Sequence, residues 1–277
     1  MKIIAFAQLR NEIEKGNLEN WFRSVSVCDF AYVYDQASTD GSQDYYKHQE
    51  FVEVSAELSK VNDFKNESLC KSRLLEKLLL EHPDADWILW IDGDTILDAR
   101  LQKREALEKL LSSAQSDAIS LGHYNLWRND LFYRTDNAYH GHQINALWKN
   151  TGKLHFKVSD ELHKDQHPEG LETSNVFPGP VGEDKPYSLI HRGFATDYQL
   201  LLKFEIYKSF GQDGWELHRL LNEEGLTLEK MPYWVLPEWY PLSIHFPDNK
   251  INNTGDLKFE IMPTGTMDKF LKEKGLV

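Results

Sequence analysis

Two aspartates separated by one glycine follow a run of large apolar residues in WILWIDGDTILD, residues 87–98. Residues i and i+2 of an extended segment project to the same side, so Asp92 and Asp94 can converge on one point. Gly93 lets the backbone bend and a ligand approach closely. Two convergent carboxylates suit Mn²⁺ or Mg²⁺, which usually also take phosphate oxygens from a substrate. The spacing predicts a metal site that bridges a diphosphate, and the alternative is an ordinary polar turn.

The composition limits the partners of such a site. The formal net charge of the 277 residues is −13, and no block of five or more basic residues occurs, which excludes phosphate-tracking binding to nucleic acid. An acidic protein that handles anionic ligands needs a metal or a few well-placed Lys and Arg side chains. Cys28 and Cys70 give neither a disulfide framework nor metal-ligand spacing, which suits a reducing compartment.

No window approaches the roughly 18 apolar residues of a membrane span. The apolar run Ile3–Ala7 ends at once in Gln8, so we interpret it as a core strand and not as an export signal. We expect a cytoplasmic protein without a transmembrane segment, which could also act peripherally at the inner face of a membrane.

Short apolar runs alternate with helical patterns over the first 120 residues. We predict strands at 3–7, 30–34, 51–54, 87–91 and 118–121, a helix capped by Asn17, and helices near 65–81 and 101–113. Strands that alternate with helices imply a parallel sheet with helices on its faces, and such sheets bind ligands at the carboxyl ends of their strands. Three polar clusters lie just past strand ends, at 8–12, 35–42 and 92–94, so the fold would gather them into one crevice.

The second half has a different character. Most histidines follow residue 120, the periodicity is weaker, and Pro178-Gly179-Pro180 interrupts the chain. Thr196 and Gln199 form a capping-box pattern that predicts a helix. We predict an α/β fold, a Rossmann-like, mostly parallel sheet flanked by helices, with an irregular α+β C-terminal half. A single domain would span 1–277, with a first half at 1–122, a second half at 123–240 and a tail at 241–277.

The clusters of the first half together resemble a known family. Leu9-Arg10-Asn11-Glu12, the segment YDQASTDGS at 34–42, and Asp92-Gly93-Asp94 are similar to segments of family 2 nucleotide-sugar-dependent glycosyltransferases, which have the type A glycosyltransferase fold. The likeness covers about the first 120 residues. Trp127-Arg128-Asn129 and His191-Arg192-Gly193-Phe194 also resemble segments of some bacterial and viral members.

The resemblance implies that 1–122 is the nucleotide-sugar-binding half and 123–240 the acceptor half with the catalytic groups, and it implies roles for individual residues. Asp35 would contact the base or ribose, and Asp92 would lie near the ribose and the metal. Asp94 would bind the metal directly, with His191 as a further ligand and His163 and His245 as rivals for that role. The remaining donor-binding residues would be Gln8, Arg10, Glu12 and Gly93, with Lys65 and Arg73 as cations near the diphosphate.

Transfer with inversion also needs a carboxylate that takes the proton of the acceptor hydroxyl. The candidates are Asp160 or Glu161, and Asp184 next to Glu183; if none lies near the acceptor, a retaining mechanism becomes possible. The acceptor would be a glycan or glycoconjugate, by analogy with the family. Aromatic residues stack on sugar faces, so at least one of four tryptophans would line the acceptor cleft, while packing in the core is the stronger expectation for any single one of them: Trp127, Trp148, Trp234 and Trp239.

Two other functions stay open from the sequence. The stretch also resembles the first motif of haloacid-dehalogenase-like phosphatases, with Asp92 as nucleophile and Asp94 as its acid partner. Against this, Ile96 stands where Thr or Val is expected, and the motif does not follow a first strand. A catalytically silent module that binds a nucleotide-sugar is the second alternative. A nucleotidyltransferase is disfavoured because no Gly-rich loop follows the first strand.

Overall fold

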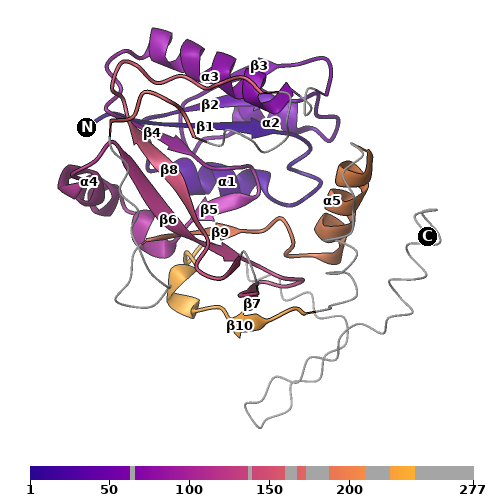
Figure 1. The fold of residues 1–277 in the computed structure, drawn as a ribbon. Helices are drawn as coiled ribbons and strands as arrows, with labels where there is room; N and C mark the ends of the chain where they lie inside the picture. Colours follow the sequence, from indigo (N-terminus) through magenta and orange to yellow (C-terminus); the bar gives the residue numbers. More distant parts are fainter. Residues whose placement is uncertain (63–65, 137–138, 160–166, 173–186, 210–224, 241–277) are drawn as a thin grey trace.

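The structure, a computed structural model, describes residues 1–62, 66–136, 139–159, 167–172, 187–209 and 225–240 (Figure 1). Eight strands form one sheet in the order β3-β2-β1-β4-β8-β6-β9-β5. Neighbours from β3 to β4 are parallel, as are β6 and β9, whereas β8 is antiparallel to β4 and β6, and β5 is antiparallel to β9. The strands are β1 Ile3–Leu9, β2 Phe30–Asp35, β3 Val54–Leu58, β4 Trp87–Trp90, β5 Thr95–Leu97, β6 Ala118–Asn125, β8 Gln143–Lys149 and β9 Ser188–His191.

This architecture confirms the expected α/β fold with a mostly parallel sheet flanked by helices. The third strand was misplaced, because it begins at Val54 and not at Phe51. The side-chain oxygen of Gln49 accepts hydrogen bonds from the backbone N–H groups of Phe51 and Val52, at 2.9 and 3.3 Å, and holds these apolar residues in a turn. Local hydrogen bonding of this kind competes with strand formation.

Helices cover both faces of the sheet. α1 (Leu18–Val25) and α4 (Arg104–Ser113) pack on one face, and α3 (Glu67–Glu81) packs on the other (Figure 1). Successive β1 residues serve the two cores in turn, with Ile3 on the α1 side and Ile4 on the α3 side. Burial of each such side chain contributes about 1.5–3 kcal/mol, so β1 fixes the centre of the fold.

The segment Asp92–Thr95 forms a turn between β4 and β5, which corrects the extended conformation assumed from the sequence. The backbone N–H of Thr95 donates to the carbonyl of Asp92 at 2.9 Å, and the chain then continues as β5. The N–H of Arg192 donates to the carbonyl of Asp94 at 2.7 Å. The turn is therefore tied to the end of β9, which comes from the second half of the chain.

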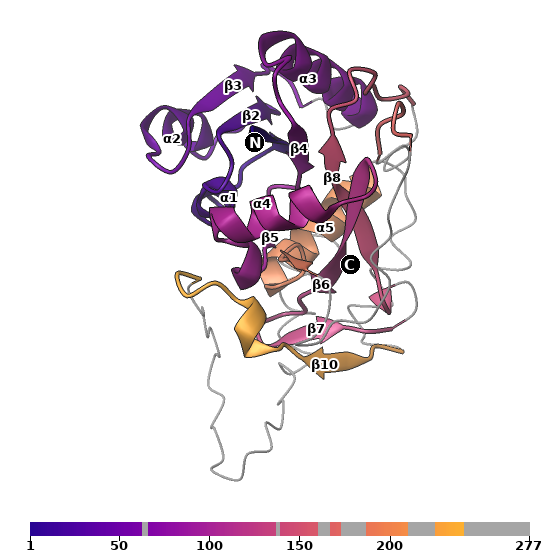
Figure 2. The ribbon, with the colours of Figure 1, turned by 90° about the vertical axis from the view of Figure 1, so that its left-hand side faces the viewer.

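The remaining elements lie outside this sheet. β7 (Phe132–Arg134) and β10 (Leu228–Lys230) form an antiparallel pair, and both views place this pair at the end of the molecule opposite α3 (Figures 1 and 2). α2 (Ser42–His48) follows β2, α5 (Asp197–Ser209) follows β9, and short 3₁₀ helices occupy Ala99–Leu101 and Tyr233–Val235. None of the described helices is long and apolar enough to cross a membrane.

Candidate active site

One pocket opens at the carboxyl ends of β1, β2 and β4, with α5 and the end of β9 as its opposite wall. It encloses about 1000 Å³, including solvent at its mouth. Most of the described residues that the sequence singled out line it: Gln8, Arg10, Glu12, Asp92, Gly93, Asp94 and His191. The prediction that separate polar clusters meet at one rim of the sheet agrees with this geometry, because carboxyl ends of parallel strands lie along a common edge.

Other predicted residues do not line this pocket. Asp35 is fully buried beneath the loop that follows β2, and Arg73 lies exposed on α3. Lys65, the base candidates Asp160, Glu161 and Asp184, and the histidines His163 and His245 all lie outside the described residues. The roles of these six residues stay predictions.

Asp94 stands at the centre of a charged cluster. Its Oδ2 atom lies 3.1 Å from Lys203 Nζ of α5 and 3.3 Å from His191 Nε2 at the end of β9. Burial alone would raise the pKa of Asp94, but the charges of Lys203 and His191 more than offset that effect and hold it well below its usual range. Asp94 is therefore a carboxylate throughout the neutral pH range.

Asp92 has a different environment. Its side chain faces the pocket, but the surrounding walls limit its hydration, and this desolvation raises the pKa of Asp92. The positive charge of Lys71 opposes the rise in pKa, and the negative charge of Asp94 adds to it. Lys71 is 1% exposed, its Nζ lies 2.6 Å from Glu67 Oε1, and it sits 4.5 Å from the centroid of the Trp90 ring. The two aspartates thus share one turn but have opposite electrostatic surroundings.

Two glycines give the cluster its space. A Cβ atom on Gly93 would lie 2.6 Å from a methyl group of Leu9 and 2.9 Å from the carboxyl carbon of Glu12. A Cβ atom on Gly193 would lie 2.1 Å from Lys203 Nζ and 2.6 Å from Asp94 Oδ2. A contact below 3.0 Å forces the neighbouring atoms to shift, so at Gly93 the missing side chain makes room for neighbouring protein atoms, and at Gly193 it makes room for the charged cluster.

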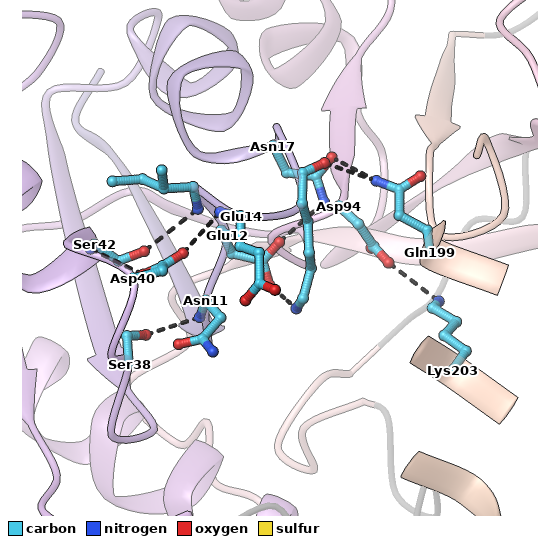
Figure 3. Close-up of polar contacts among 12 residues, drawn as sticks. Asn11, Glu12, Glu14, Asn17, Ser38, Asp40, Ser42, Asp94, Gln199 and Lys203 are labelled. Atoms are coloured by element: carbon cyan, nitrogen blue, oxygen red, sulfur yellow. Dashed lines mark hydrogen bonds and ion pairs between the residues drawn. The ribbon is translucent and has the colours of Figure 1, made fainter. Parts of the chain in front are cut away.

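The loop after β1 is fixed by hydrogen bonds to the loop after β2. The N–H of Asn11 donates to Ser38 Oγ, and that of Glu14 donates to Asp40 Oδ2, both at 2.8 Å (Figure 3). Glu12 accepts from Lys15 Nζ at 2.6 Å and from Asn17 Nδ2 at 3.0 Å, so its predicted place in the pocket is accompanied by structural contacts. Asn17 caps no backbone group of α1, contrary to expectation.

α5 is docked onto that same loop. Gln199 Nε2 donates to the carbonyl of Lys15 at 3.0 Å and to Asn17 Oδ1 at 3.2 Å (Figure 3). Arg192 Nη1 donates to the carbonyl of Gly16 at 2.8 Å. Thr196 Oγ1 accepts from the N–H of Gln199 at 3.1 Å, which confirms the predicted helix start. The loop after β1 and α5 therefore hold each other in place on two sides of the pocket.

The structure assigns the predicted tryptophans mainly to packing. Trp127 and Trp148 are buried in hydrophobic clusters, and Trp234 and Trp239 pack against a third cluster. None of the four lines the pocket described here. The aromatic residues that do line it are Trp90 and Tyr207.

Sequence reasoning missed Lys203 and Gln199 as pocket residues, and it chose Arg73 where Lys71 is the buried cation. The helical phase of α3 contained a usable signal. Lys71 precedes Leu74, Leu75 and Leu78 by three, four and seven residues, which puts it on the buried face. Arg73 lies two residues further on, away from that face. No local pattern in the sequence points to Lys203, because Asp94 is more than one hundred residues away in the chain and His191 lies on another element.

The expected Mn²⁺ or Mg²⁺ can be tested against the side chains present. Asp94 and His191 converge, but the ammonium group of Lys203 lies 3.1 Å from both Asp94 Oδ2 and His191 Nε2. Across the residues that the structure describes, no group of three or more His, Cys, Asp or Glu side chains could hold a metal ion. In this arrangement the predicted ligands Asp92, Asp94 and His191 do not fit a divalent cation.

Comparison with known proteins gives a match to one family model. Residues 28–151 match the galactosyl transferase GMA12/MNN10 family, a stretch that runs from before β2 to after β8 and includes Asp92 and Asp94. The match covers under half of the chain. It supports a glycosyl-transferring enzyme and agrees with the resemblance seen in the motifs. Among curated proteins, no relative matches the chain at a significant level.

Solved structures give weaker likenesses. S. aureus TarS 1–349 in complex with UDP-GlcNAc is 14% identical, with a TM-score of 0.44; the match covers 69% of this chain and 59% of that one. The complex of TarS 1–349 with UDP has the same identity and TM-score, with coverage of 79% and 73%. For the longer TarS structure the coverage is 80% of this chain and 42% of TarS, so this chain spans well under two thirds of that protein.

Proposed function

We propose that this chain transfers a sugar from a nucleotide-diphosphate-sugar donor to a hydroxyl group of a glycan or glycoconjugate. The observation that carries the proposal is the pocket itself, in which polar residues from the ends of β1 and β4 face a cationic residue of α5. The family match supports the reaction class, because the matched stretch contains the Asp92–Asp94 turn. The family match does not identify the donor or the acceptor, so both are parts of the proposal.

Unpartnered nitrogen atoms indicate where the nucleoside would bind. Arg10 Nη1 and Gln36 Nε2 are buried atoms of pocket-lining side chains that have no hydrogen-bond partner within the described part of the chain. Buried donors without partners are costly, at about 1–3 kcal/mol each, so a ligand with acceptor oxygens would relieve them. Base carbonyl and ribose oxygens fit this requirement. The diphosphate would then extend toward Asp94 and Lys203.

The reaction exchanges one bond for another at the anomeric carbon. The bond from that carbon to the β-phosphate oxygen breaks, and the nucleoside diphosphate leaves with the electron pair. The acceptor oxygen forms the new bond and gives its proton to a base. Asp160, Glu161 and Asp184 remain the predicted bases, and inversion remains the predicted stereochemical outcome.

A screen of nucleotide-sugars for release of nucleoside diphosphate tests this function. We expect slow hydrolysis of at least one donor without added acceptor, in buffer that contains Mn²⁺ and in buffer that contains EDTA. Asp92→Asn should lower that rate by about 10- to 100-fold, because the resemblance places Asp92 at the ribose and a hydrogen bond to a charged group is worth about 1.5–3 kcal/mol. Asp44→Asn is the matched control, because Asp44 is exposed on α2 and pairs only locally with Lys47.

Three outcomes would contradict the proposal. If no donor binds and none is hydrolysed, the proposed function is refuted. Tight binding of a donor that releases no nucleoside diphosphate with any acceptor would indicate the silent binding module. Hydrolysis of a generic aryl phosphate that is lost in Asp92→Asn would favour the phosphatase alternative instead.

A further inference from the structure

Lys203 reaches the pocket from a helix whose position is fixed. Gln199 and Lys203 are four residues apart on α5 and therefore lie on the same helix face. Gln199 is 3% exposed and bonds to the loop after β1, as described above. Lys203 extends from the next turn to Asp94 (Figure 3). Its position is thus set by the same contacts that dock the helix.

The ammonium group has a built environment. It lies 3.1 Å from Asp94 Oδ2, 3.1 Å from His191 Nε2 and 4.8 Å from the centroid of the Phe194 ring. Gly193 passes so close that any Cβ atom would collide with it. The Lys203 side chain keeps 25% of its surface exposed, and it lines the pocket. An ammonium has three N–H donors, so two can face Asp94 and His191 while one remains for a ligand.

Electrostatics keep this group charged. Burial would lower the pKa of Lys203, but the Asp94 carboxylate beside it raises the pKa above its ordinary value. The Asp92–Asp94 turn would repel a diphosphate, which carries more than one negative charge. A cation beside Asp94 removes that repulsion, and an ammonium is an established ligand for phosphate oxygens.

We propose that Lys203 supplies the positive charge that a divalent metal was expected to supply at Asp94, and that it binds an oxygen of the donor's diphosphate directly. Binding of the diphosphate then needs no divalent metal. This inference rests on the proposed function, since it names the group that holds the donor's diphosphate. A metal ion at Asp94 and His191 would have to displace the Lys203 side chain, which extends from a helix that Gln199 holds in place.

Titration calorimetry on the full chain tests the proposal with UDP, GDP, CDP, dTDP and ADP as probes, each in EDTA and again in Mn²⁺. We expect at least one of them to bind in EDTA, with its Kd changed less than about threefold by Mn²⁺. Lys203→Met removes the charge at nearly constant length and should weaken binding in EDTA by about 10- to 100-fold. Lys203→Arg should keep most of the affinity.

Lys77→Met serves as the matched control. Lys77 lies on α3 outside the pocket, its ion pair with Glu57 spans 4.0 Å, and its side chain is 37% exposed. Its Kd should equal that of the wild type. If Lys203→Met does not fold, the comparison of wild-type binding in EDTA and Mn²⁺ still decides the matter.

The outcomes separate this proposal from the function on which it rests. Wild-type binding that requires Mn²⁺ would overturn the role of Lys203 and leave the glycosyltransferase function standing. Binding by Lys203→Met that equals or exceeds the wild type would overturn it too, and would indicate that Lys203 only occupies a metal position. Failure of all five nucleotides under both conditions would overturn both proposals.

Discussion

The structure gives Asp35 a role that its substitution should expose. Its Oδ1 accepts hydrogen bonds from the N–H of Ser38 at 2.8 Å and from Gln43 Nε2 at 2.7 Å, and its Oδ2 accepts from the Tyr46 hydroxyl at 2.7 Å. Asp35 is 0% exposed, so it positions the loop after β2 and does not face the pocket. We predict that its replacement lowers stability and changes nucleotide binding only through that loop.

The magnitude follows from the three donors. Tyr46 is 3% exposed, and after Asp35→Ala its hydroxyl would lose its carboxylate acceptor and keep only the hydrogen bond with the Ser38 side chain, at a cost of about 1–3 kcal/mol. Ser38 and Gln43 are only partly buried and can turn to water, which reduces their share to about 1 kcal/mol each. The expected loss in free energy of unfolding is therefore about 3–5 kcal/mol. Asp35→Asn keeps one acceptor and should lose about 1–2 kcal/mol.

Urea unfolding followed by tryptophan fluorescence measures these losses, with Tyr46→Phe as a matched variant that removes one donor and leaves Asp35 in place. We expect Asp35→Asn to keep the Kd for the bound nucleoside diphosphate within about threefold of the wild type. A loss below about 1 kcal/mol in Asp35→Ala would refute the reasoning. So would an Asp35→Asn variant with wild-type stability and an altered base preference, because that result would place Asp35 against the base.

Three further predictions follow from single contacts. Gly193→Ala keeps the charge of Lys203 but displaces it, so the Kd for nucleoside diphosphate in EDTA should rise by about tenfold, and an unchanged Kd in calorimetry would contradict the packing argument. Burial raises the pKa of Cys28 to about 12, so an aromatic disulfide reagent at pH 8 should label this thiol only after urea unfolding; rapid labelling of the native protein would be the contrary result. Burial would raise the pKa of Asp40, but hydrogen bonds from Ser42 and from the N–H of Glu14 lower it below its usual 3.8, so its contribution to stability is present above that pH and is lost as the pH falls. Urea titrations from pH 5 to pH 3 should show a shallower decline for Asp40→Asn than for the wild type, and equal slopes would contradict the assignment.

The sequence predicted those parts of the site that depend on strand ends. Apolar runs locate β1, β2 and β4, and the residues that follow each strand must lie along one edge of a parallel sheet. That rule was sufficient to bring Gln8, Arg10 and Asp92 together. It could not decide which side chains face the pocket. Asp35 points inward because Tyr46 and Gln43 donate hydrogen bonds to its carboxylate oxygens.

The other wall of the pocket could not be predicted in the same way. Lys203 meets Asp94 only because β9 joins the sheet beside β5 and α5 docks on the loop after β1. These are contacts between segments that are far apart in the chain, and no local pattern encodes them. The conformation at Asp92–Thr95 was missed for a related reason, because β5 forms by pairing with β9 and so requires a turn after β4.

A crystal structure of the chain with a bound nucleoside diphosphate, grown in EDTA, would test the central claim most directly. The account predicts that the nucleotide occupies the pocket at the ends of β1 and β4, with a diphosphate oxygen within about 3 Å of Lys203 Nζ. It also predicts base or ribose oxygens near Arg10 and Gln36. A nucleotide bound elsewhere, or a diphosphate that turns away from α5 while Lys203 stays on Asp94, would contradict it.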